Sequence, residues 1–395
     1  MLACTIGVGS GVTGLPFYTL GLFVLPLQEQ FGWSRGQTQG MFTIFTFAGL
    51  ACVPIVGYLV DRFDVRKVVL WSMVGAALGF ALLGLATHSL TSFYILGALL
   101  AVLAAGTSPI SWTRAITGWF DKQRGIALGL ALAGTGIAGW LAPQYVAALL
   151  EAYSWREAYF GLAILPAIAF VFVFWLLKNP PLPEQATAAS AEEVAGEPVS
   201  VDVTLHDALR HRHFWLIGIG FFCVSMGVGG SIPNLVPLMV DTGISTAQAA
   251  SYVGWLGLSV ITGRLVAGYL IDRFWAPGVA AVMLSLPAIA ALLLSQGLIE
   301  PFWLLFSIGL IGLAAGAEFD LIAYLVSRYF GTLHYAKIYA LLYAIFMFGA
   351  GIAPPLFGYC YDLFGSYAPV LHTAAGLFVG GACLLLLLGR YPHGT

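Results

Sequence analysis

Four charged residues lie inside long apolar stretches of the sequence, and three of them lie well away from the ends of these stretches and have side chains of types that do chemistry. Arg264 falls in the apolar run 248–270, and Glu318 and Asp320 fall in the run 302–327. Charges inside a membrane span are costly and usually have a function. An arginine fork can hold a carboxylate through two parallel hydrogen bonds, and a buried carboxyl group can gain or lose a proton. Together they predict a site that binds an anion and takes up a proton.

These three side chains are expected at a similar depth. Arg264 and Asp320 each lie about five residues past the middle of their runs, and Glu318 lies about three residues past it. Because a helix rises 1.5 Å per residue, these offsets place all three side chains at a similar distance from the middle of the membrane. An Arg–carboxylate pair lowers the desolvation cost of both partners; its alternative interpretation is a salt bridge with a structural role only. Glu318 and Asp320 point about 200° apart on a helix. We expect one to face a polar path and the other to brace a neighbouring helix. Asp320 is favoured for the path because it shares its face with Gly316 and Tyr324.

The composition places these residues in a membrane protein. The chain has 395 residues, of which 60% are hydrophobic and 9% charged, whereas a soluble domain has roughly 25% charged residues. Most of its twelve apolar runs are long enough to cross about 30 Å of hydrocarbon. We therefore predict an all-α membrane protein with 12 transmembrane helices. The runs lie at roughly 3–27, 40–60, 68–87, 91–118, 126–150, 158–177, 214–240, 248–270, 279–297, 302–327, 338–361 and 369–389.

The basic residues predict the orientation of these spans. Arg35 and Arg156 fall in loops on one side, Arg114 and Arg264 fall within spans, and the other twelve of the 16 Lys and Arg fall in loops on the opposite side. Because basic loops stay in the cytoplasm, we expect a multi-pass protein of the plasma (cytoplasmic, or cell inner) membrane with both termini inside. Arg114 is near a span end, where its side chain can reach the headgroups. The twelve are Arg62, Arg66, Lys67, Lys122, Arg124, Lys178, Arg210, Arg212, Arg273, Arg328, Lys337 and Arg390.

The start of the chain lacks the charged region of a signal peptide, since Arg35 is the first basic residue. We expect either a very short cytoplasmic tail or a truncated start. No free basic face supports nucleic acid as a partner.

Two landmarks repeat at an offset of 211 residues. Such a repeat predicts two parallel, pseudo-symmetric six-helix bundles. We assign residues 1–178 to the first bundle, 179–212 to a cytoplasmic linker that ends in a short amphipathic helix, and 213–395 to the second bundle. The landmarks are Gly57-Tyr58-Leu59-Val60-Asp61-Arg62 with Gly268-Tyr269-Leu270-Ile271-Asp272-Arg273, and Gly32-Trp33-Ser34-Arg35-Gly36-Gln37 with Gly243-Ile244-Ser245-Thr246-Ala247-Gln248.

The first charged turn continues to Arg66 and Lys67, and its pattern Gly-x-x-x-Asp-Arg-x-x-x-Arg-Lys resembles the signature of the major facilitator superfamily. Asp64 stands where that family usually has glycine. The resemblance implies the major facilitator fold and transport by alternating access. It also implies that both turns take part in conformational gating, through Gly57, Asp61, Arg62, Arg66, Gly268, Asp272 and Arg273.

A second pattern, Gly263-Arg264-Leu265-Val266-Ala267-Gly268, resembles the monocarboxylate-porter and oxalate–formate-antiporter branch, as do Trp33-Ser34-Arg35 and Trp119-Phe120-x-x-x-Arg124-Gly125-x-Ala127-x-Gly129. The resemblance implies that Arg264 binds the anion. The lysine that oxalate–formate exchangers carry in the eleventh span would fall near Phe346 and is absent here. One arginine without that lysine argues against a small dicarboxylate. The basic residue that animal monocarboxylate porters carry in the first span is absent.

The fold implied by the resemblance lines a central cavity with the first, fourth, seventh and tenth spans. Tyr18, Trp112, Asn234 and Tyr324 are then candidate substrate contacts, with ordinary packing as the alternative. The aromatic residues of this cavity favour an aryl or branched carboxylate over acetate. Glycine-rich stretches in the fifth span (134–139) and the eleventh (349–355) indicate a bending, closely packed face between the bundles.

The charges predict how an anion and a proton are coupled. Arg264, Glu318 and Asp320 sum to −1 when all three are ionised, so an arriving anion is repelled unless one carboxylate takes up a proton. We therefore expect proton-coupled symport of a small organic anion, a monocarboxylate, with Asp320 and Glu318 as proton-coupling residues. The same −1 would attract a cation, which leaves a proton-coupled antiporter that exports cationic or amphiphilic compounds as the alternative.

Other functions have little support in the sequence. A non-transporting sensor or scaffold lacks a signalling domain, and an enzyme lacks a phosphate loop, nucleophile motif or metal-ligand cluster. No cofactor or metal is expected: His206, His211 and His213 have no firm ligand spacing and indicate a solvated face. We expect a monomer with an organic anion, a proton and the bilayer as partners. The cysteines are expected to be small buried hydrophobic residues: Cys4, Cys52, Cys223, Cys360 and Cys383.

Overall fold

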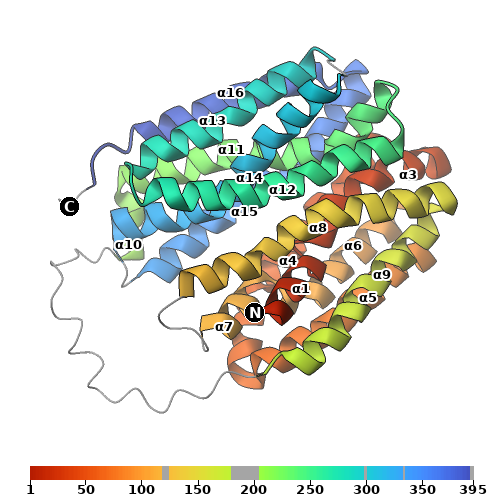
Figure 1. The fold of residues 1–395 in the computed structure, drawn as a ribbon, viewed down its shortest axis with the longest axis horizontal. Coiled ribbons are helices and arrows are strands. Elements are labelled where there is room, and N and C mark those ends of the chain that lie inside the picture. The colour runs from red at the N-terminus through yellow and green to blue at the C-terminus, as the bar shows by residue number, and fades with distance from the viewer. Residues whose placement is uncertain (118–123, 179–203, 298–299, 332–333, 392–395) are drawn as a thin grey trace.

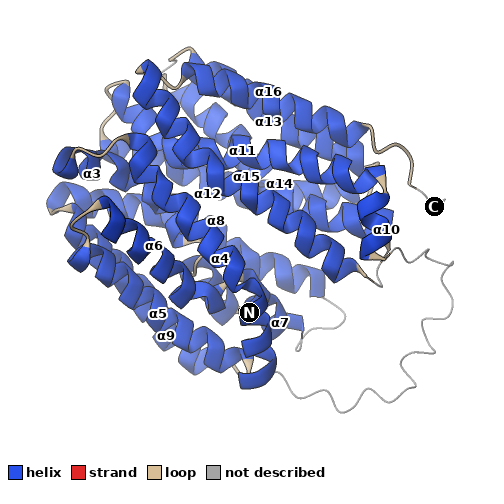
Figure 2. Cartoon of the chain, turned by 180° about the vertical axis from the view of Figure 1, so that it is seen from behind, coloured by secondary structure: helices blue, strands red, loops and turns tan. Residues whose placement is uncertain are grey.

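The computed structural model describes residues 1–117, 124–178, 204–297, 300–331 and 334–391. All regular secondary structure in these ranges is helical (Figure 2). The α-helices are α1 (Leu2–Ser10), α2 (Leu15–Thr19), α3 (Val24–Phe31), α4 (Arg35–Phe63), α5 (Val65–Ala86), α6 (Leu90–Ala104), α7 (Pro109–Thr117), α8 (Arg124–Ala152), α9 (Trp155–Leu176), α10 (Leu205–Arg210), α11 (Arg212–Asp241), α12 (Thr246–Ile271), α13 (Ala276–Ser295), α14 (Pro301–Phe330), α15 (Tyr335–Phe364) and α16 (Ala368–Leu386). Two 3-10 helices, η1 (Leu20–Phe23) and η2 (Ala105–Thr107), interrupt the first and fourth apolar runs.

Ten helical stretches of the described chain are long and apolar enough to cross a membrane, and the bent stretch from α1 to α3 makes an eleventh. α8 has 29 residues and occupies the position of the fifth run. Each of the twelve apolar runs therefore corresponds to one of these helical stretches. The all-α membrane fold predicted from the sequence is confirmed.

The first apolar run is broken rather than continuous. α1 and the α2–α3 stretch meet at an angle of 49°. Pro16 stands in the first turn of α2, where its missing N–H costs no helical hydrogen bond. A Cβ on Gly14 would overlap the carbonyl oxygen of Gly9, so this bend requires glycine. The first span therefore bends between Gly14 and Pro16.

The repeated landmarks adopt the same local structure in both halves. Gly32 and Gly243 have φ angles of 69° and 92°, in the left-handed region that favours glycine. Two residues later, the Ser34 and Ser245 hydroxyls accept hydrogen bonds from the backbone N–H groups of the helices that follow. A left-handed glycine and a serine cap thus start α4 and α12 alike.

The helices pack in two groups, α1–α9 and α10–α16, which form the lower and upper parts of Figure 1. The groups meet where α4 contacts α15, α8 contacts α12 and η1 contacts α11. We call this contact surface between the two groups the seam, and small residues allow the helices to pack closely there. A Cβ on Gly139 would stand 3.1 Å from the Gly257 Cα, and one on Gly351 would stand 3.1 Å from the Thr46 Cβ. The closely packed face predicted for the fifth and eleventh spans is confirmed.

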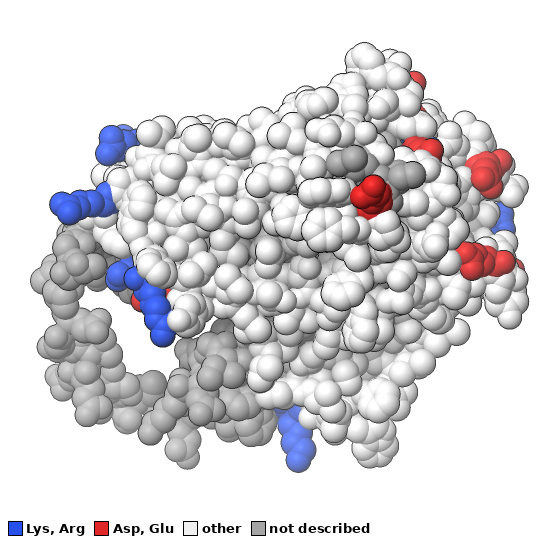
Figure 3. All heavy atoms as spheres, turned by 45° about the horizontal axis from the view of Figure 1, so that its top comes forward, with Lys and Arg blue, Asp and Glu red and all other residues white. Residues whose placement is uncertain are grey.

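The molecule has two ends, here named after the segments found there. The Arg35 end is where α4 begins and α15 finishes; the linker end is where α9 finishes and α10 begins. Figure 3 shows most of the visible Lys and Arg side chains toward the linker end and most of the visible Asp and Glu side chains toward the Arg35 end.

Most of the predicted linker, 179–203, lies outside the described residues, as do Trp119, Phe120 and Lys122 of the second sequence pattern. The predicted short helix at the end of the linker is present as α10, and the Thr204 hydroxyl caps it by accepting from the Asp207 N–H.

The five cysteines are free thiols, and they differ in burial. Cys4 and Cys52 are buried, Cys223 and Cys360 are partly buried, and Cys383 on α16 is exposed. The burial predicted for them is therefore wrong for Cys383. An apolar run does not by itself imply burial in a membrane protein, because the lipid that surrounds the helices is as apolar as their side chains.

Candidate functional site

The central charged residues are brought together by close packing of α12 against α14. A Cβ on Gly312 would stand 2.6 Å from the Ser259 Cβ, and one on Gly316 would stand 3.0 Å from the Arg264 backbone nitrogen. Gly263 approaches the Leu313 backbone in the same way. Glycines at these contacts let two helix backbones approach closely in a membrane. The approach puts Arg264 of α12 beside the turn of α14 that carries Asp320.

Arg264 and Asp320 form a loose ion pair. One guanidinium nitrogen, Nη1, lies 3.5 Å from one carboxylate oxygen, Oδ1, and no second contact joins the pair. The Arg264 side chain is 12% exposed and the Asp320 side chain 32% exposed. The predicted ion pair is confirmed, and its single long contact leaves donors of the Arg264 fork for another acceptor.

Glu318 lies apart from this pair. Only 3% of the Glu318 residue is exposed, and its Oε1 has no hydrogen-bond partner among the described residues. Tyr18 of α2 is also buried, packs against Gly139, and lies within electrostatic range of Arg264 and Glu318. Three helices thus bring Tyr18, Arg264, Glu318 and Asp320 into one region.

The other three candidate substrate residues have different surroundings. Trp112 is fully buried, and its indole N–H donates to the Thr107 carbonyl oxygen at 2.9 Å. Asn234 is buried between the two groups, where it bonds Gln39 of α4. Tyr324 is partly buried one turn beyond Asp320. None of the interactions recorded for the described residues joins Trp112 or Asn234 to Arg264.

A second Arg–Asp pair closes the Arg35 end, and the sequence did not single it out. The two terminal nitrogens of Arg35 donate to the two carboxylate oxygens of Asp241, each at 2.6 Å. The guanidinium also stacks on Tyr361 at 3.7 Å and donates to the Tyr367 hydroxyl at 3.1 Å. Burial raises the pKa of Tyr367, so its hydroxyl stays neutral and can accept. Arg35 itself is 4% exposed.

A carboxylate from the second group also caps the start of α4. Asp362 accepts the backbone N–H groups of Arg35 and Gly36 at 3.0 and 2.8 Å, which places a negative charge at the positive end of the helix dipole. A Cβ on Gly358 would stand 2.7 Å from the Arg35 carbonyl carbon. The approach of α15 to α4 therefore requires glycine here.

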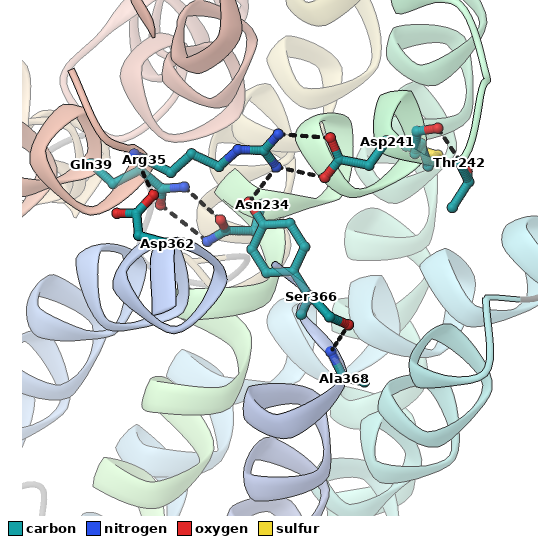
Figure 4. Close-up of polar contacts among 10 residues, drawn as sticks. Arg35, Gln39, Asn234, Asp241, Thr242, Asp362, Ser366 and Ala368 are labelled. Carbon is teal, nitrogen blue, oxygen red and sulfur yellow. Dashed lines mark hydrogen bonds and ion pairs between the residues drawn. The ribbon is translucent and has the colours of Figure 1, made fainter. Parts of the chain in front are cut away.

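A buried amide pair lies below these charges on the same seam. The Gln39 amide donates to the Asn234 oxygen at 2.5 Å, and the Asn234 amide donates back at 3.0 Å (Figure 4). We call the contacts of Arg35, Gln39, Asn234, Asp241 and Asp362 the seam lock. One sequence signal could have indicated it: Gly358 and Asp362 repeat the Gly-x-x-x-Asp spacing of the two charged turns.

The charged turns themselves lie at the linker end and are loosely packed. Apart from the adjacent backbone of the same helix, none of the described residues has an atom within 4 Å of the position that a Cβ would take on Gly57 or on Gly268. These two glycines therefore make no close contact with another helix among the described residues in this conformation. Asp64 has a φ of 71°, which is uncommon for a residue other than glycine, and this explains why glycine is usual at that position.

Basic residues of the turns contact their own group. Arg62 lies over the Tyr58 ring, and Arg273 lies 3.7 Å from the centre of the Tyr269 ring. Arg66 donates to the Phe174 carbonyl oxygen at 2.6 Å and so ties the turn to the end of α9. Asp272 is exposed at the end of α12, and the side chain of Asp61 lies outside what the structure describes.

The described residues contain no group of three or more His, Cys, Asp or Glu side chains placed to hold a metal ion. The chemistry of the site is therefore that of an arginine, two carboxyl groups and aromatic rings between two helix groups. A buried ionic site of this kind, in a many-span protein with one end sealed, is typical of a membrane carrier.

Comparison with known proteins defines the family. The Major Facilitator Superfamily model matches residues 6–342 and 217–395. The chain therefore belongs to the Major Facilitator Superfamily, and it is a secondary transporter of small molecules rather than an enzyme.

Relatives with curated names share about a quarter of their residues with the chain. Monocarboxylate transporter 12 of Xenopus laevis is 23% identical, over 94% of this chain and 83% of that protein. Monocarboxylate transporter 11 of Homo sapiens is 26% identical, over 94% and 79%. The uncharacterized MFS-type transporter YhjX of Escherichia coli is 24% identical, over 84% and 81%.

Solved structures support the fold. The inward-facing, unoccupied crystal structure of a bacterial homolog to the human lysosomal transporter Spinster has a TM-score of 0.71, with 19% identity over 98% of this chain and 94% of that one. At this identity the likeness concerns the fold alone.

Proposed function

We propose that this transporter carries a small organic monoanion, a monocarboxylate, together with a proton. The observation that carries the proposal is the loose Arg264–Asp320 pair, joined by one contact of 3.5 Å on partly exposed side chains. An arginine fork held so weakly can exchange its partner for a substrate carboxylate, which offers two acceptor oxygens. The names of the monocarboxylate transporters among the relatives support the same substrate class.

Proton coupling follows from the charges around Arg264. With Asp320 and Glu318 ionised, the three groups sum to −1, and a second anion at Arg264 would be repelled. Uptake of a proton by Asp320 releases Arg264 to the substrate and keeps the region neutral. Glu318 is the second proton-coupling candidate, because it is buried with an oxygen that lacks a hydrogen-bond partner among the described residues.

The two ends of the molecule differ in packing, as expected for a transporter that opens one end at a time by alternating access. The seam lock closes the Arg35 end, and the glycines of the charged turns at the linker end are not packed. We propose that transport opens the first end and packs the second, with gating at Gly57, Asp61, Arg62, Arg66, Gly268, Asp272 and Arg273. The basic residues at the linker end favour a cytoplasmic position for it and for both termini, in the plasma membrane. A monomer suffices, because the site is formed within one chain.

The test is uptake of labelled pyruvate and other monocarboxylates into proteoliposomes, with and without an inward proton gradient. We expect gradient-driven uptake that is lost in Arg264→Ala and loses its gradient dependence in Asp320→Asn or Glu318→Gln. Full pH-driven uptake by both carboxyl variants would rule out this coupling. Uptake of lipophilic cations instead of carboxylates, unaffected by Arg264→Ala, would favour the export of cationic or amphiphilic compounds.

A further inference from the structure

Three tyrosines form a column on one face of α15, and neither the charged site nor the seam lock accounts for them. Tyr335, Tyr339 and Tyr343 are four residues apart, so they project from the same side of the helix. Their ring centres lie 5.6 and 6.0 Å apart, with interplanar angles of 12° and 24°. Phe346 continues the column, 6.5 Å beyond Tyr343.

The column leads from the linker end to the depth of the charged site. Tyr335 is the first residue of α15, at the linker end. Phe319, the neighbour of Asp320 on α14, lies 5.8 Å from Tyr343 and 5.2 Å from Phe346 between ring centres. Tyr339 lies within electrostatic range of both Arg264 and Asp320. A molecule bound at Arg264 would therefore have these rings beside it.

The tyrosines differ from rings that only fill a core. All three are partly exposed, and no hydrogen bond joins the hydroxyl of Tyr335, Tyr339 or Tyr343 to any residue that the structure describes. By contrast, the hydroxyls of Tyr94, Tyr145 and Tyr329 each donate to a backbone carbonyl oxygen. Phenols on a partly exposed face, with no hydrogen-bond partner among the described residues, are suited to contact water or a ligand.

We infer that the tyrosine column selects carboxylates with an aromatic group, whose carboxylate binds Arg264 while the ring stacks on Tyr339 and Tyr343. This inference rests on the proposed function and narrows its substrate class. Arg264 supplies the positive charge for a carboxylate, and the column supplies flat aromatic faces that contact Phe319, the neighbour of Asp320. An aromatic ring stacks on such faces more favourably than a saturated ring of the same size.

The experiment measures equilibrium binding to the purified full-length protein in detergent, which avoids passive diffusion of protonated acids through a bilayer. The probes are benzoate, cyclohexanecarboxylate and acetate. We expect benzoate to bind about tenfold more tightly than cyclohexanecarboxylate, the factor for about 1.4 kcal/mol from stacking on two rings. Tyr343→Leu should abolish this ratio, and Tyr343→Phe, which keeps the ring, should retain it.

The matched control is Tyr359→Leu, a loss of an aromatic ring on the same helix at a position that is 58% exposed; it should leave the ratio unchanged. Equal binding of benzoate and cyclohexanecarboxylate, both dependent on Arg264, would overturn the inference and leave the proposed function standing. If no carboxylate binds, or if binding is unaffected by Arg264→Ala, the proposed function itself fails, and this inference fails with it.

Discussion

The molecule contains two Arg–Asp pairs that are built in opposite ways. Arg35 and Asp241 share two contacts of 2.6 Å, and Arg35 is further held by Tyr361 and Tyr367. Arg264 and Asp320 share one contact of 3.5 Å. The first pair joins the two helix groups, whereas the second lies within one group. The first geometry suits a contact that stabilises one conformation; the second suits a site whose partner is exchanged.

The glycines at the two ends also differ: those at the Arg35 end are tightly packed, and those at the linker end are not. Gly36 and Gly358, at the Arg35 end, lie in backbone contact across the seam, with a Cβ on Gly36 only 3.0 Å from the Tyr359 nitrogen. For Gly57 and Gly268, at the linker end, no described residue outside the adjacent backbone of the same helix comes within 4 Å of the place where a Cβ would stand. Packing therefore distinguishes the ends independently of charge, and it indicates that the lock, rather than the charged turns, holds the present conformation.

The largest effect is expected from fixing the seam permanently. A Cβ on Gly351 would lie 3.1 Å from the Thr46 Cβ, near the separation that a disulfide needs. In a background without the native cysteines, oxidation of Thr46→Cys with Gly351→Cys should stop proteoliposome uptake, because the Arg35 end can no longer open. Reduction should restore it.

The control cross-link lies within one group. A Cβ on Gly106 would stand 3.0 Å from the Ser72 Cβ, so Ser72→Cys with Gly106→Cys offers a similar spacing without crossing the seam. Its oxidation should leave uptake intact. Unimpaired transport by the oxidised seam pair would show that the Arg35 end does not open.

A smaller effect is expected from breaking the lock at one residue. Asp241→Asn leaves the buried Arg35 guanidinium without its counter-charge, which costs about 2–5 kcal/mol and shifts the population toward an open Arg35 end. Spin labels can be attached at Gln30→Cys and Thr242→Cys, two exposed positions of different groups at this end. The distance between the two labels should be longer with Asp241→Asn than without it.

The matched control substitution for Asp241→Asn is Glu300→Gln. Glu300 is an exposed acid at the same end, and its side chain makes no capping hydrogen bond. It should leave the label distances unchanged. Native-like distances in Asp241→Asn would mean that packing alone closes the seam.

The smallest effect is expected from adding one methyl group to the seam. Gly358→Ala puts a Cβ 2.7 Å from the Arg35 carbonyl carbon, and the required backbone shift should destabilise the closed end by about 1–3 kcal/mol. The same spin labels should then show a minor population at longer distance. Gly376→Ala, with no neighbour within 4 Å, is the control, and an equal response in both variants would argue against close packing at Gly358.

The central site could be predicted from the sequence because charges inside apolar runs are rare and conspicuous. Arg264 and Asp320 stood out in this way, and their equal depth was enough to predict a pair. The seam lock was not predicted, because Arg35, Asp241 and Asp362 lie at helix ends, where charged residues are common. The Gly-x-x-x-Asp spacing of Gly358 and Asp362 indicates that the position is unusual but not which residues it contacts. The partnership of Arg35 with Asp241 and Asp362 spans 206 and 327 residues of sequence and depends on which end of the seam is closed.

Asn234 illustrates the same limit. Its place on the seventh apolar run indicated a cavity, but its partner Gln39 is 195 residues away on another helix. Periodicity shows which face of a helix is polar, and only the packing of the two groups decides what that face meets. The spacing of the tyrosines on α15 was visible in the sequence, but its relation to Arg264 was not.

The most direct test of the division between the two pairs is equilibrium binding of one transported monocarboxylate to Arg264→Ala and Arg35→Ala side by side. We expect Arg264→Ala to weaken binding by about thirtyfold or more, the factor for about 2 kcal/mol from a lost charged hydrogen-bond partner. Arg35→Ala should leave binding within about threefold, since it alters only the balance between conformations. Equal losses of binding affinity in the two variants, or normal binding by Arg264→Ala, would contradict this division of roles between the two pairs.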